Sequence, residues 1–463
     1  MKEFADCPFK IDKKLMLDEA LKVDAEMRES KKKLSDCEID SELKEQLLNV
    51  AKWCAGKVVL TTYETMRMNS LALGCIDFSL VILDEAQKIK NIGVLQSNAA
   101  KALKGGMCIA MTGTPIENSL MDLWGIMDFV LPGHLTSKEE FKKEYSSRAS
   151  KTPAGSEERL ALKTSLETAL SPVWFRRTKM ELIRSGKKTL PSITHFDSDV
   201  DLSGSVTNRH LVKMTATQKD LYDGYVGYYN SAEKGQKLAA LRSMIEVCAA
   251  PWLATNDEFS WNNRNRLFDL SPKLKITIEI LEQIRSRSEK EGRKVIIFAN
   301  IKEIQRNIAF FIFDWNRNTS KQRIEVEVYN GDLPGDSRKK ALDRFKSADG
   351  FQVIIISPKA GGAGLNIVEA NHVIHYTREW NPALEKQATD RVYRIGQTRP
   401  VFVYYPTTAG LEIKSAEEHL ADVLQSKRDI MEDFTICPAD TSGTKRIRSS
   451  EPHFGQRPVG HSI

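Results

Sequence analysis

Short apolar runs, each followed by a polar turn, are the feature of this sequence that most limits its fold. A first set lies at Val58–Leu60, Leu80–Leu83 and Met107–Met111. A second set lies further along the chain, at Val295–Phe298, Val353–Ile356, Val373–Tyr376 and Val401–Tyr404. Because these runs alternate with helical patterns, they are typical of buried parallel strands. The sequence therefore predicts an α/β fold with two parallel-sheet lobes.

The patterns around these two sets divide the chain into five segments. Residues 1–57 carry apolar positions at helical spacing, which predicts amphipathic helices. Residues 58–133 are expected to form part of the first lobe, 134–290 a largely helical insertion and connector, and 291–430 the second lobe. Residues 431–463 collect Ser, Thr, Gly, Pro and basic residues without periodicity, which is typical of a disordered tail.

Composition excludes several classes of protein. The chain has 463 residues, 41% of them hydrophobic and 28% charged, as in ordinary globular proteins. Its net charge of +6 is too small at this length to indicate nucleic-acid binding by itself. No apolar run approaches the ~18 residues of a membrane span, and the seven cysteines are scattered without metal-ligand spacing. We expect no membrane partner, and a location in the cytoplasm with the nucleoid in a prokaryote or in the nucleus of a eukaryote.

Two carboxylates, Asp84 and Glu85, directly follow the apolar run Leu80–Leu83. Open α/β sheets bind ligands at the carboxyl ends of their strands. In phosphoryl transfer, Asp84 would hold a magnesium ion through its water shell, and Glu85 would orient or deprotonate the attacking water. An acidic pair after a strand is also common by chance, so this signal needs support from other motifs.

Two further turns follow predicted strands. Thr112 and Thr114 lie after the run that ends at Met111, where their hydroxyls could hydrogen-bond the neighbouring carboxylates and sense phosphate release. Lys359–Asn366 is rich in glycine, which lets a backbone approach a phosphate closely. Each segment taken alone is better explained as a tight turn.

The most specific local signal lies between Gln387 and Gln397. Gln387, Arg391 and Arg394 are spaced i, i+4 and i+7, which predicts that all three lie on one face of a helix. Exposed arginines on a helix usually serve solubility. After a glycine-rich turn in a second lobe, they are also typical of arginine fingers that stabilise γ-phosphate charge.

Taken in order, the blocks resemble those of superfamily two helicases, and in particular the SWI/SNF-related DNA translocases. The resemblance covers roughly residues 58 to 405. It is carried by Thr61–Glu64, Asp84–Gln87, Thr112–Asn118, Phe175–Lys179, Leu190–Pro191, Gln218, Tyr222, Leu241–Pro251, Ser271–Leu274 and Trp380–Gln397.

This resemblance implies two RecA-like lobes and DNA-dependent hydrolysis of ATP, with Mg²⁺, coupled to tracking along double-stranded DNA. It assigns catalysis to Asp84, Glu85, Gln87, Gln387, Arg391 and Arg394, with Asp84 as the metal residue. It assigns coupling to Thr112 and Thr114, and DNA contacts to Thr61, Thr62, Gly362, Gly364, Asn366 and Trp380.

One motif of the family has no counterpart in this sequence. An ATP site of this kind needs a glycine-rich loop that ends in Lys-Ser or Lys-Thr, because its backbone amides and lysine cradle the phosphates. No segment before Asp84 fits this pattern, so the first lobe is expected to be incomplete. The chain is then an amino-terminally truncated form of a longer protein, one half of a split motor whose phosphate loop is separately encoded, or a decayed copy.

The sequence allows three alternative functions. In the first, the chain is a DNA-dependent ATPase that is inactive in isolation and becomes active when the upstream segment with the phosphate loop is joined to it. Alternatively, it is a DNA-binding or interaction protein that keeps a translocase scaffold without turnover. An RNA helicase of the same superfamily is a third reading, which Trp380–Pro382 and the Arg-Ile-Gly-Gln ending at Gln397 disfavour.

Overall fold

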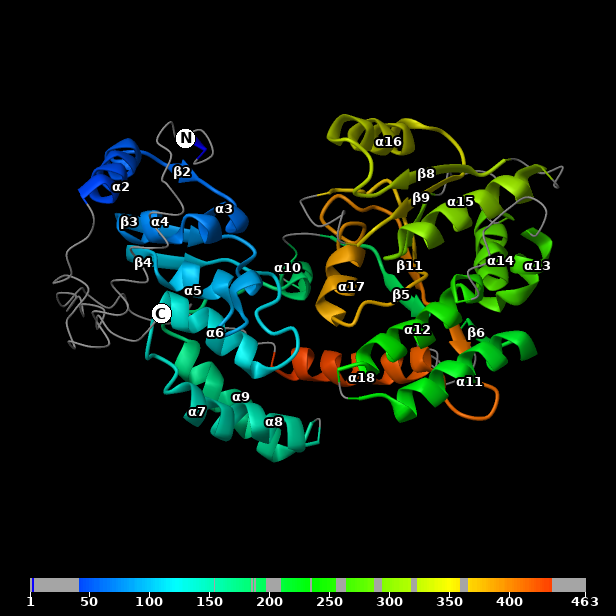
Figure 1. Cartoon of the computed structure of the whole chain (residues 1–463), viewed down its shortest axis with the longest axis horizontal. Helices are drawn as coiled ribbons and strands as arrows, with labels where there is room; N and C mark the ends of the chain where they lie inside the picture. The colour runs from blue at the N-terminus through cyan, green and yellow to red at the C-terminus, as the bar shows by residue number, and fades with distance from the viewer. Residues whose placement is uncertain are drawn as a thin grey trace. The chain divides into compact units, whose positions relative to one another are not determined.

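The computed structural model describes residues 2–3, 41–153, 155–184, 186, 189–196, 210–233, 235–254, 264–286, 294–317, 323–358 and 365–434. The chain forms two compact units, one of residues 1–176 with 429–463, and one of residues 177–428. The fold class predicted from the sequence is confirmed, since both units contain parallel strands and helices (Figure 1). None of the helices within the described ranges is long and apolar enough to cross a membrane.

The second unit is built around a six-stranded parallel sheet, with the strand order β5-β11-β10-β7-β9-β8. Neighbouring strands run parallel throughout, so each connection must cross over the sheet. The strands are β5 (Ile193–Phe196), β7 (Lys294–Phe298), β8 (Glu325–Tyr329), β9 (Gln352–Ile356), β10 (His372–His375) and β11 (Val401–Tyr404).

Alternate residues of this sheet enter two separate cores, one on each face. Val295 and Ile297 pack with helices on one face, while Ile296 and Phe298 pack with other helices on the opposite face. The first face is covered by α13 (Arg264–Leu270), α14 (Pro272–Ser286) and α15 (Lys302–Arg317), and the second by α16 (Gly335–Ser347) and α17 (Pro382–Thr389). The sheet is thus buried on both sides, as expected for parallel strands.

Within the described residues, the rest of the second unit contains a short pair of strands and four α-helices. A second pair of parallel strands joins β6 (Leu211–Lys213) to β12 (Thr407–Ala409). The helices are α10 (Lys179–Arg184), α11 (Ala216–Ser231), α12 (Lys237–Ala249) and most of α18 (Ala416–Asp433).

The first unit contains a two-stranded parallel sheet of β3 (Asp77–Leu83) and β4 (Lys104–Ala110). A separate short pair joins β1 (Lys2–Glu3) to β2 (Val59–Leu60). The surrounding helices are α2 (Ser41–Cys54), α3 (Tyr63–Met68), α4 (Ser70–Gly74) and α5 (Leu95–Lys101). Val81 and Leu83 of β3 are buried among residues of these helices.

Helices form a second core in the first unit. Capping boxes at Ser119 and Ser137 begin α6 (Leu120–Val130) and α7 (Lys138–Phe141). After α7 the chain continues through a π-helix (Lys142–Ser146), α8 (Ser147–Lys151) and α9 (Glu157–Leu170). Phe434, directly after α18, is buried in this core beneath the Arg159 guanidinium.

All seven apolar runs contain or overlap a parallel strand, so the strand predictions are confirmed. Sequence reasoning missed β1, β5, β6, β8 and β12. Of these, β5 lies inside the segment expected to be helical and forms an edge of the second unit's sheet. The reason is composition, because Ile193–Phe196 has only one aliphatic residue and a histidine. The expected helices before residue 41, and the tail from 435 to 463, lie outside the described residues, whereas α18 continues to Asp433.

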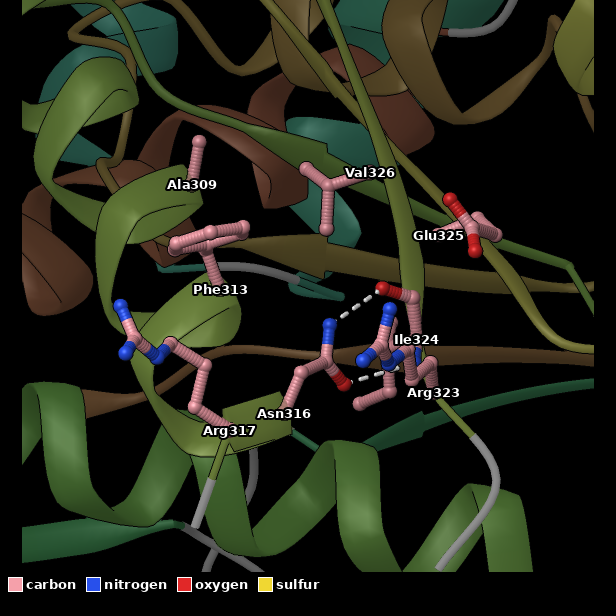
Figure 2. A pocket seen from close by; sticks show the side chains of 8 residues that line it. All are labelled: Ala309, Phe313, Asn316, Arg317, Arg323, Ile324, Glu325 and Val326. Atoms are coloured by element: carbon pink, nitrogen blue, oxygen red, sulfur yellow. Dashed lines mark hydrogen bonds between the residues drawn. The ribbon is translucent and has the colours of Figure 1, made fainter. Parts of the chain in front are cut away.

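Asn316, near the end of α15, fixes the start of β8 at the sheet edge. Its side-chain Nδ2 donates to the Ile324 carbonyl at 2.8 Å, and the Ile324 amide donates to Asn316 Oδ1 at 2.8 Å (Figure 2). The pocket beside these two hydrogen bonds is lined by eight residues, including Phe313, Arg317 and Arg323. None of the residues assigned to catalysis lines it.

Two helical glycines should respond in opposite ways to substitution by alanine. In α6, a Cβ at Gly125 would lie 2.4 Å from the Lys90 carbonyl oxygen, so we expect Gly125→Ala to lower the free energy of unfolding by about 1–3 kcal/mol. In α11, a Cβ at Gly224 would meet nothing within 4 Å, so Gly224→Ala should raise it by about 0.5–1 kcal/mol. Urea unfolding measures both, and an unchanged or raised stability of the Gly125 variant would contradict the close approach.

A buried histidine makes the second unit sensitive to acid. His375 is stacked between the rings of Phe298 and Tyr405, and its Nε2 lies 2.9 Å from the Thr389 hydroxyl. Burial lowers its pKa to about 4, because the charged form loses its hydration. A histidine whose pKa is depressed on folding stabilises the fold above its unfolded pKa of about 6.5, and that stability is lost as the pH falls.

We therefore expect the free energy of unfolding to fall by on the order of 2 kcal/mol between pH 7 and pH 4.5 on account of His375. Urea unfolding at both pH values gives this difference. The variant His375→Gln cannot titrate and should show a correspondingly smaller difference. An equal dependence on pH in both proteins would show that other groups cause it.

Candidate active site

The two carboxylates of the first unit lie where β3 and β4 end. The Met111 amide donates to the Leu83 carbonyl at 2.8 Å, and the Ala86 amide donates to the Met111 carbonyl at 2.9 Å. These bonds extend the pairing of the strands past their last residues. Glu85 sits in the left-handed region with φ 52°, a conformation unusual for a residue with a side chain. The turn at Glu85 is therefore held by the neighbouring strand, and Asp84 remains exposed.

A chain of hydrogen bonds connects the two strand ends. The Gln87 Nε2 donates to Glu85 Oε2 at 2.7 Å, and the Thr112 hydroxyl donates to Gln87 Oε1 at 2.6 Å. The prediction that the threonine hydroxyls hydrogen-bond the carboxylates directly is therefore wrong for Thr112. The Gln87 side chain lies between Thr112 and Glu85 and connects them, because its amide oxygen accepts one hydrogen bond and its amide nitrogen donates the other.

The turn after β4 is fixed by a second group of charged side chains. The Thr114 amide donates to the Thr112 hydroxyl at 3.1 Å, and the Thr114 hydroxyl lies 3.4 Å from Glu117 Oε1. Glu117 is buried and forms an ion pair with Lys90. The Glu117 amide donates to Asp122 Oδ2 at 2.9 Å. The turn that carries both threonines is therefore anchored to the start of α6.

Tyr63 is a residue of this site whose role the sequence did not indicate. Its hydroxyl donates to the Asp84 carbonyl oxygen at 2.8 Å. Burial, followed by the nearby charges of Asp84 and Glu85, raises the pKa of Tyr63 well above its usual value. Tyr63 therefore stays protonated and donates a hydrogen bond that ties α3 to the end of β3. Its position in the block Thr61–Glu64 was the only available signal.

The two threonines assigned to DNA contact lie at the start of α3. Thr61 and Thr62 are both exposed. The Thr62 side chain caps the helix by accepting from the Thr65 amide at 3.1 Å. Both threonines therefore lie at the amino-terminal end of a helix, the end that favours a nearby negative charge.

In the second unit, the predicted helical face of Gln387, Arg391 and Arg394 is wrong. Helix α17 ends at Thr389, so only Gln387 is helical. The Arg391 and Val392 amides donate three residues back, to Ala388 and Thr389, which closes tight turns in place of another helical turn. Both arginines therefore lie in turns after the helix.

The two arginines have different surroundings. The Arg391 side chain is buried, and its Nη1 lies 3.4 Å from the Leu365 carbonyl oxygen. Arg394 is exposed, and its guanidinium has no hydrogen-bond or ion-pair partner among the described residues. Of the two, Arg394 is the cation that an external phosphate can reach directly.

Side chains that the sequence did not single out hold this arginine segment. The Lys179 ammonium donates to Asp390 Oδ1 and to the Tyr393 carbonyl, both at 2.5 Å. Arg378 and Glu385, a residue of α17, form a buried two-bond ion pair at 2.6 and 2.9 Å. The Gln397 side-chain Nε2 donates to the carbonyls of Val368 and Ala370, which closes the segment on the preceding loop.

The remaining predicted site residues lie in the second unit. Gly362 and Gly364 fall within residues 359–364, outside the part of the chain that the structure describes. Asn366 is exposed, Trp380 is 43% exposed, and the Trp380 carbonyl accepts from Lys427 at 2.8 Å.

The oxygen groups around Asp84 suit a magnesium ion that arrives with a nucleotide. Asp84 Oδ1 accepts the Glu85 amide at 2.9 Å, and the carboxylate is exposed. Magnesium is typically held by one or two carboxylates together with waters and substrate phosphates. No group of three or more His, Cys, Asp or Glu side chains within the described ranges is arranged to hold a metal ion on its own.

Comparison with known proteins agrees with these motifs. A sequence model of the SNF2-related domain matches residues 25–251, and a model of the helicase conserved C-terminal domain matches residues 272–396. The Zorya protein ZorD of Escherichia coli is 37% identical over 392 residues, which cover 84% of this chain and 34% of ZorD. Chromodomain-helicase-DNA-binding protein 1 of Homo sapiens is 29% identical over 83% of this chain and 21% of its own length.

Among solved structures, the Sulfolobus solfataricus SWI2/SNF2 ATPase core in complex with dsDNA is 28% identical, covering 85% of this chain and 80% of its own, with a TM-score of 0.37. The chain spans about a third of the length of ZorD. The two domain matches, together with the sequence identity to ZorD, show that the chain belongs to the SNF2-related family of helicase-like ATPases.

Proposed function

We propose that this chain contributes most of an ATP-driven motor that moves along double-stranded DNA. The observation that supports this most directly is the hydrogen-bonded series Glu85, Gln87 and Thr112 at the carboxyl ends of β3 and β4. In this proposal Glu85 orients or deprotonates the water that attacks the γ-phosphorus of ATP. Magnesium, held through water by Asp84, would neutralise the phosphate oxygens.

The second unit would supply the positive charge for the same reaction. Arg394 is exposed without a partner in the described residues, and Lys179 fixes the turns that carry it. Arg391 and Gln387 are proposed to complete the ATP site, as the family resemblance implies. Double-stranded DNA is the proposed partner, with Thr61, Thr62, Gly362, Gly364, Asn366 and Trp380 near its backbone. Such contacts would place the motor in the nucleoid or the nucleus.

The missing phosphate-binding loop bears on the activity of the isolated chain. We infer that residues 1–463 alone hydrolyse ATP slowly or not at all, and that joining them to a segment with a Gly-Lys-Thr or Gly-Lys-Ser loop restores hydrolysis. The test compares ATP hydrolysis by the two proteins with and without duplex DNA. Absence of DNA-stimulated hydrolysis in the joined protein would refute the proposed motor. Stimulation by RNA in place of duplex DNA would favour an RNA helicase.

A non-enzymatic role is the second candidate, because the sequence has no segment before Asp84 that can cradle phosphates. In that case the chain binds DNA or another protein through the same scaffold without turnover. Duplex DNA binding by the isolated chain that is unaffected by ATP, with no hydrolysis by the joined protein, is the expected result. Tight ATP binding by the isolated chain, with hydrolysis lost on Arg394→Ala, would exclude it.

A further inference from the structure

Tyr63, the first residue of α3, contacts the chain on both sides of Glu85. Its hydroxyl donates to the carbonyl oxygen of Asp84, the residue directly before Glu85, at 2.8 Å. The Lys88 ammonium, three residues after Glu85, lies over the Tyr63 ring at 5.2 Å from its centroid. The positive φ of Glu85 is unusual for a residue with a side chain, so it persists only where surrounding contacts fix it. Tyr63 supplies two such contacts.

Helix α3 also packs directly against this turn. Met66, one helical turn after Tyr63, is 2% exposed. It lies in the same apolar core as Leu83 and Ala86, and Tyr63 packs against that core. Protein interiors are close-packed, so a displacement of α3 is felt at the end of β3. The Tyr63 hydroxyl adds direction to this contact, because its hydrogen bond fixes the Asp84 carbonyl group itself.

The two residues before Tyr63 are those proposed to lie near the DNA backbone. Thr61 and Thr62 are exposed, whereas Tyr63 is half-buried. The Thr62 side chain is tied to α3, because it accepts from the Thr65 amide at 3.1 Å. A contact made at Thr62 is therefore one residue away from the hydrogen bond to Asp84. An exposed segment and a half-buried hydroxyl meet at the start of a single short helix.

We propose that Tyr63 is a positioning residue that links duplex DNA at the two preceding threonines to the turn at Glu85. DNA bound there restricts α3, and the Tyr63 hydroxyl passes this restriction to the Asp84 carbonyl. Glu85, the next residue, is then held where it orients the attacking water. This inference rests on the proposed function, in which Tyr63 itself has no assigned role.

Hydrogen exchange in the whole chain tests this link without nucleotide. With saturating duplex DNA, we expect the peptide from Asp84 to Lys88 to exchange about 5-fold more slowly than without DNA. Tyr63→Phe removes the hydrogen bond and keeps the ring beside Lys88. In this variant the slowing should fall below about 2-fold, with an affinity for DNA within about 2-fold of the unaltered chain.

Tyr145→Phe is the matched control. The Tyr145 hydroxyl lies 2.9 Å from the Ser165 hydroxyl in the same unit, so this variant also loses one tyrosine hydrogen bond. It should show the same slowing of exchange as the unaltered chain. The two variants should also unfold at similar temperatures, because each loses a single hydrogen bond and no ring.

Hydrolysis by the chain joined to a phosphate-loop segment gives a second readout. Tyr63→Phe should lower the rate at saturating duplex DNA about 5-fold more than it lowers the rate without DNA. The DNA concentration that gives half-maximal stimulation should stay the same, because Tyr63 positions the turn and does not hold the DNA. Tyr145→Phe should leave both rates as they are in the unaltered protein.

Equal slowing of exchange in Tyr63→Phe and the unaltered chain would overturn the link. Weaker DNA binding by Tyr63→Phe would assign the hydroxyl to binding, and unfolding far below the temperature of Tyr145→Phe would assign it to stability, so either result would overturn the link too. Absence of DNA binding by the unaltered chain would refute the DNA partner of the proposed function, and the link with it.

Discussion

Replacing Glu85 by glutamine should lower DNA-stimulated ATP hydrolysis by roughly 100-fold to 10,000-fold in the chain joined to a phosphate-loop segment. The carboxylate lies at the end of β3 with one oxygen held by the Gln87 amide at 2.7 Å. Glutamine has the same shape and can still accept this bond, so the turn should keep its structure. What it cannot do is take a proton from water. The loss should therefore appear in kcat, with ATP binding retained.

Steady-state hydrolysis with saturating duplex DNA measures this effect, and equilibrium binding of ATP measures the retained affinity. Glu158→Gln is a suitable control, because Glu158 is an exposed carboxylate of the same unit that pairs with Arg148 at 2.9 Å. It should hydrolyse ATP at the unaltered rate. Full activity of the Glu85 variant would contradict its role in activating water. An equal loss in the control would point to a general effect of lost surface charge.

Replacing Lys273 by methionine should lower the free energy of unfolding of the second unit by about 3–5 kcal/mol. Lys273 and Glu417 form an ion pair at 2.5 Å, with side chains that are 0% and 2% exposed. The second oxygen of Glu417 accepts the Thr408 amide at 2.9 Å. Without the lysine, the carboxylate would remain buried with its charge uncompensated, which is the main source of the expected cost.

Urea unfolding of single and double variants separates the two contributions. Lys273→Met with Glu417→Gln removes both charges and keeps an acceptor for the Thr408 amide, so it should regain much of the lost stability. Lys302→Met is the exposed control, because Lys302 and Asp332 are 55% and 43% exposed, and it should cost less than about 1 kcal/mol. A double variant no more stable than Lys273→Met would show that the lost packing, not the unpaired charge, sets the cost.

Periodicity and motif order in the sequence were sufficient to predict seven of the parallel strands and the family. Runs such as Val295–Phe298 and Val353–Ile356 are apolar at every position because both faces of their sheet are buried. The apolar run before them likewise predicted that Asp84 and Glu85 follow the carboxyl end of a strand. These features depend on residues close together in the chain, so they can be recognised without knowing the contacts made elsewhere.

The helix after Trp380 shows where such local reasoning failed. Spacing predicted that Arg391 and Arg394 continue the helical face of Gln387, but the helix ends at Thr389. Lys179, more than 200 residues earlier in the chain, binds Asp390 and the Tyr393 carbonyl and holds the turned conformation. Helical spacing carries no information about such a distant partner. β5 was missed because its composition is not typical of a buried strand, and its place beside β11 is decided by pairing with a segment distant in the chain.

By itself, the sequence determined the fold class, the family and the residue types of the site, because these follow from short patterns and their order. Only the tertiary structure decided how those residues are connected, since the contacts of Thr112 with Gln87 and of Tyr63 with Asp84 join separate segments. It also decided that Leu80, Ile82 and Met107 are exposed in the part of the chain that the structure describes. An apolar run looks the same in sequence whether one or both of its faces are packed, and only the neighbouring elements settle the difference.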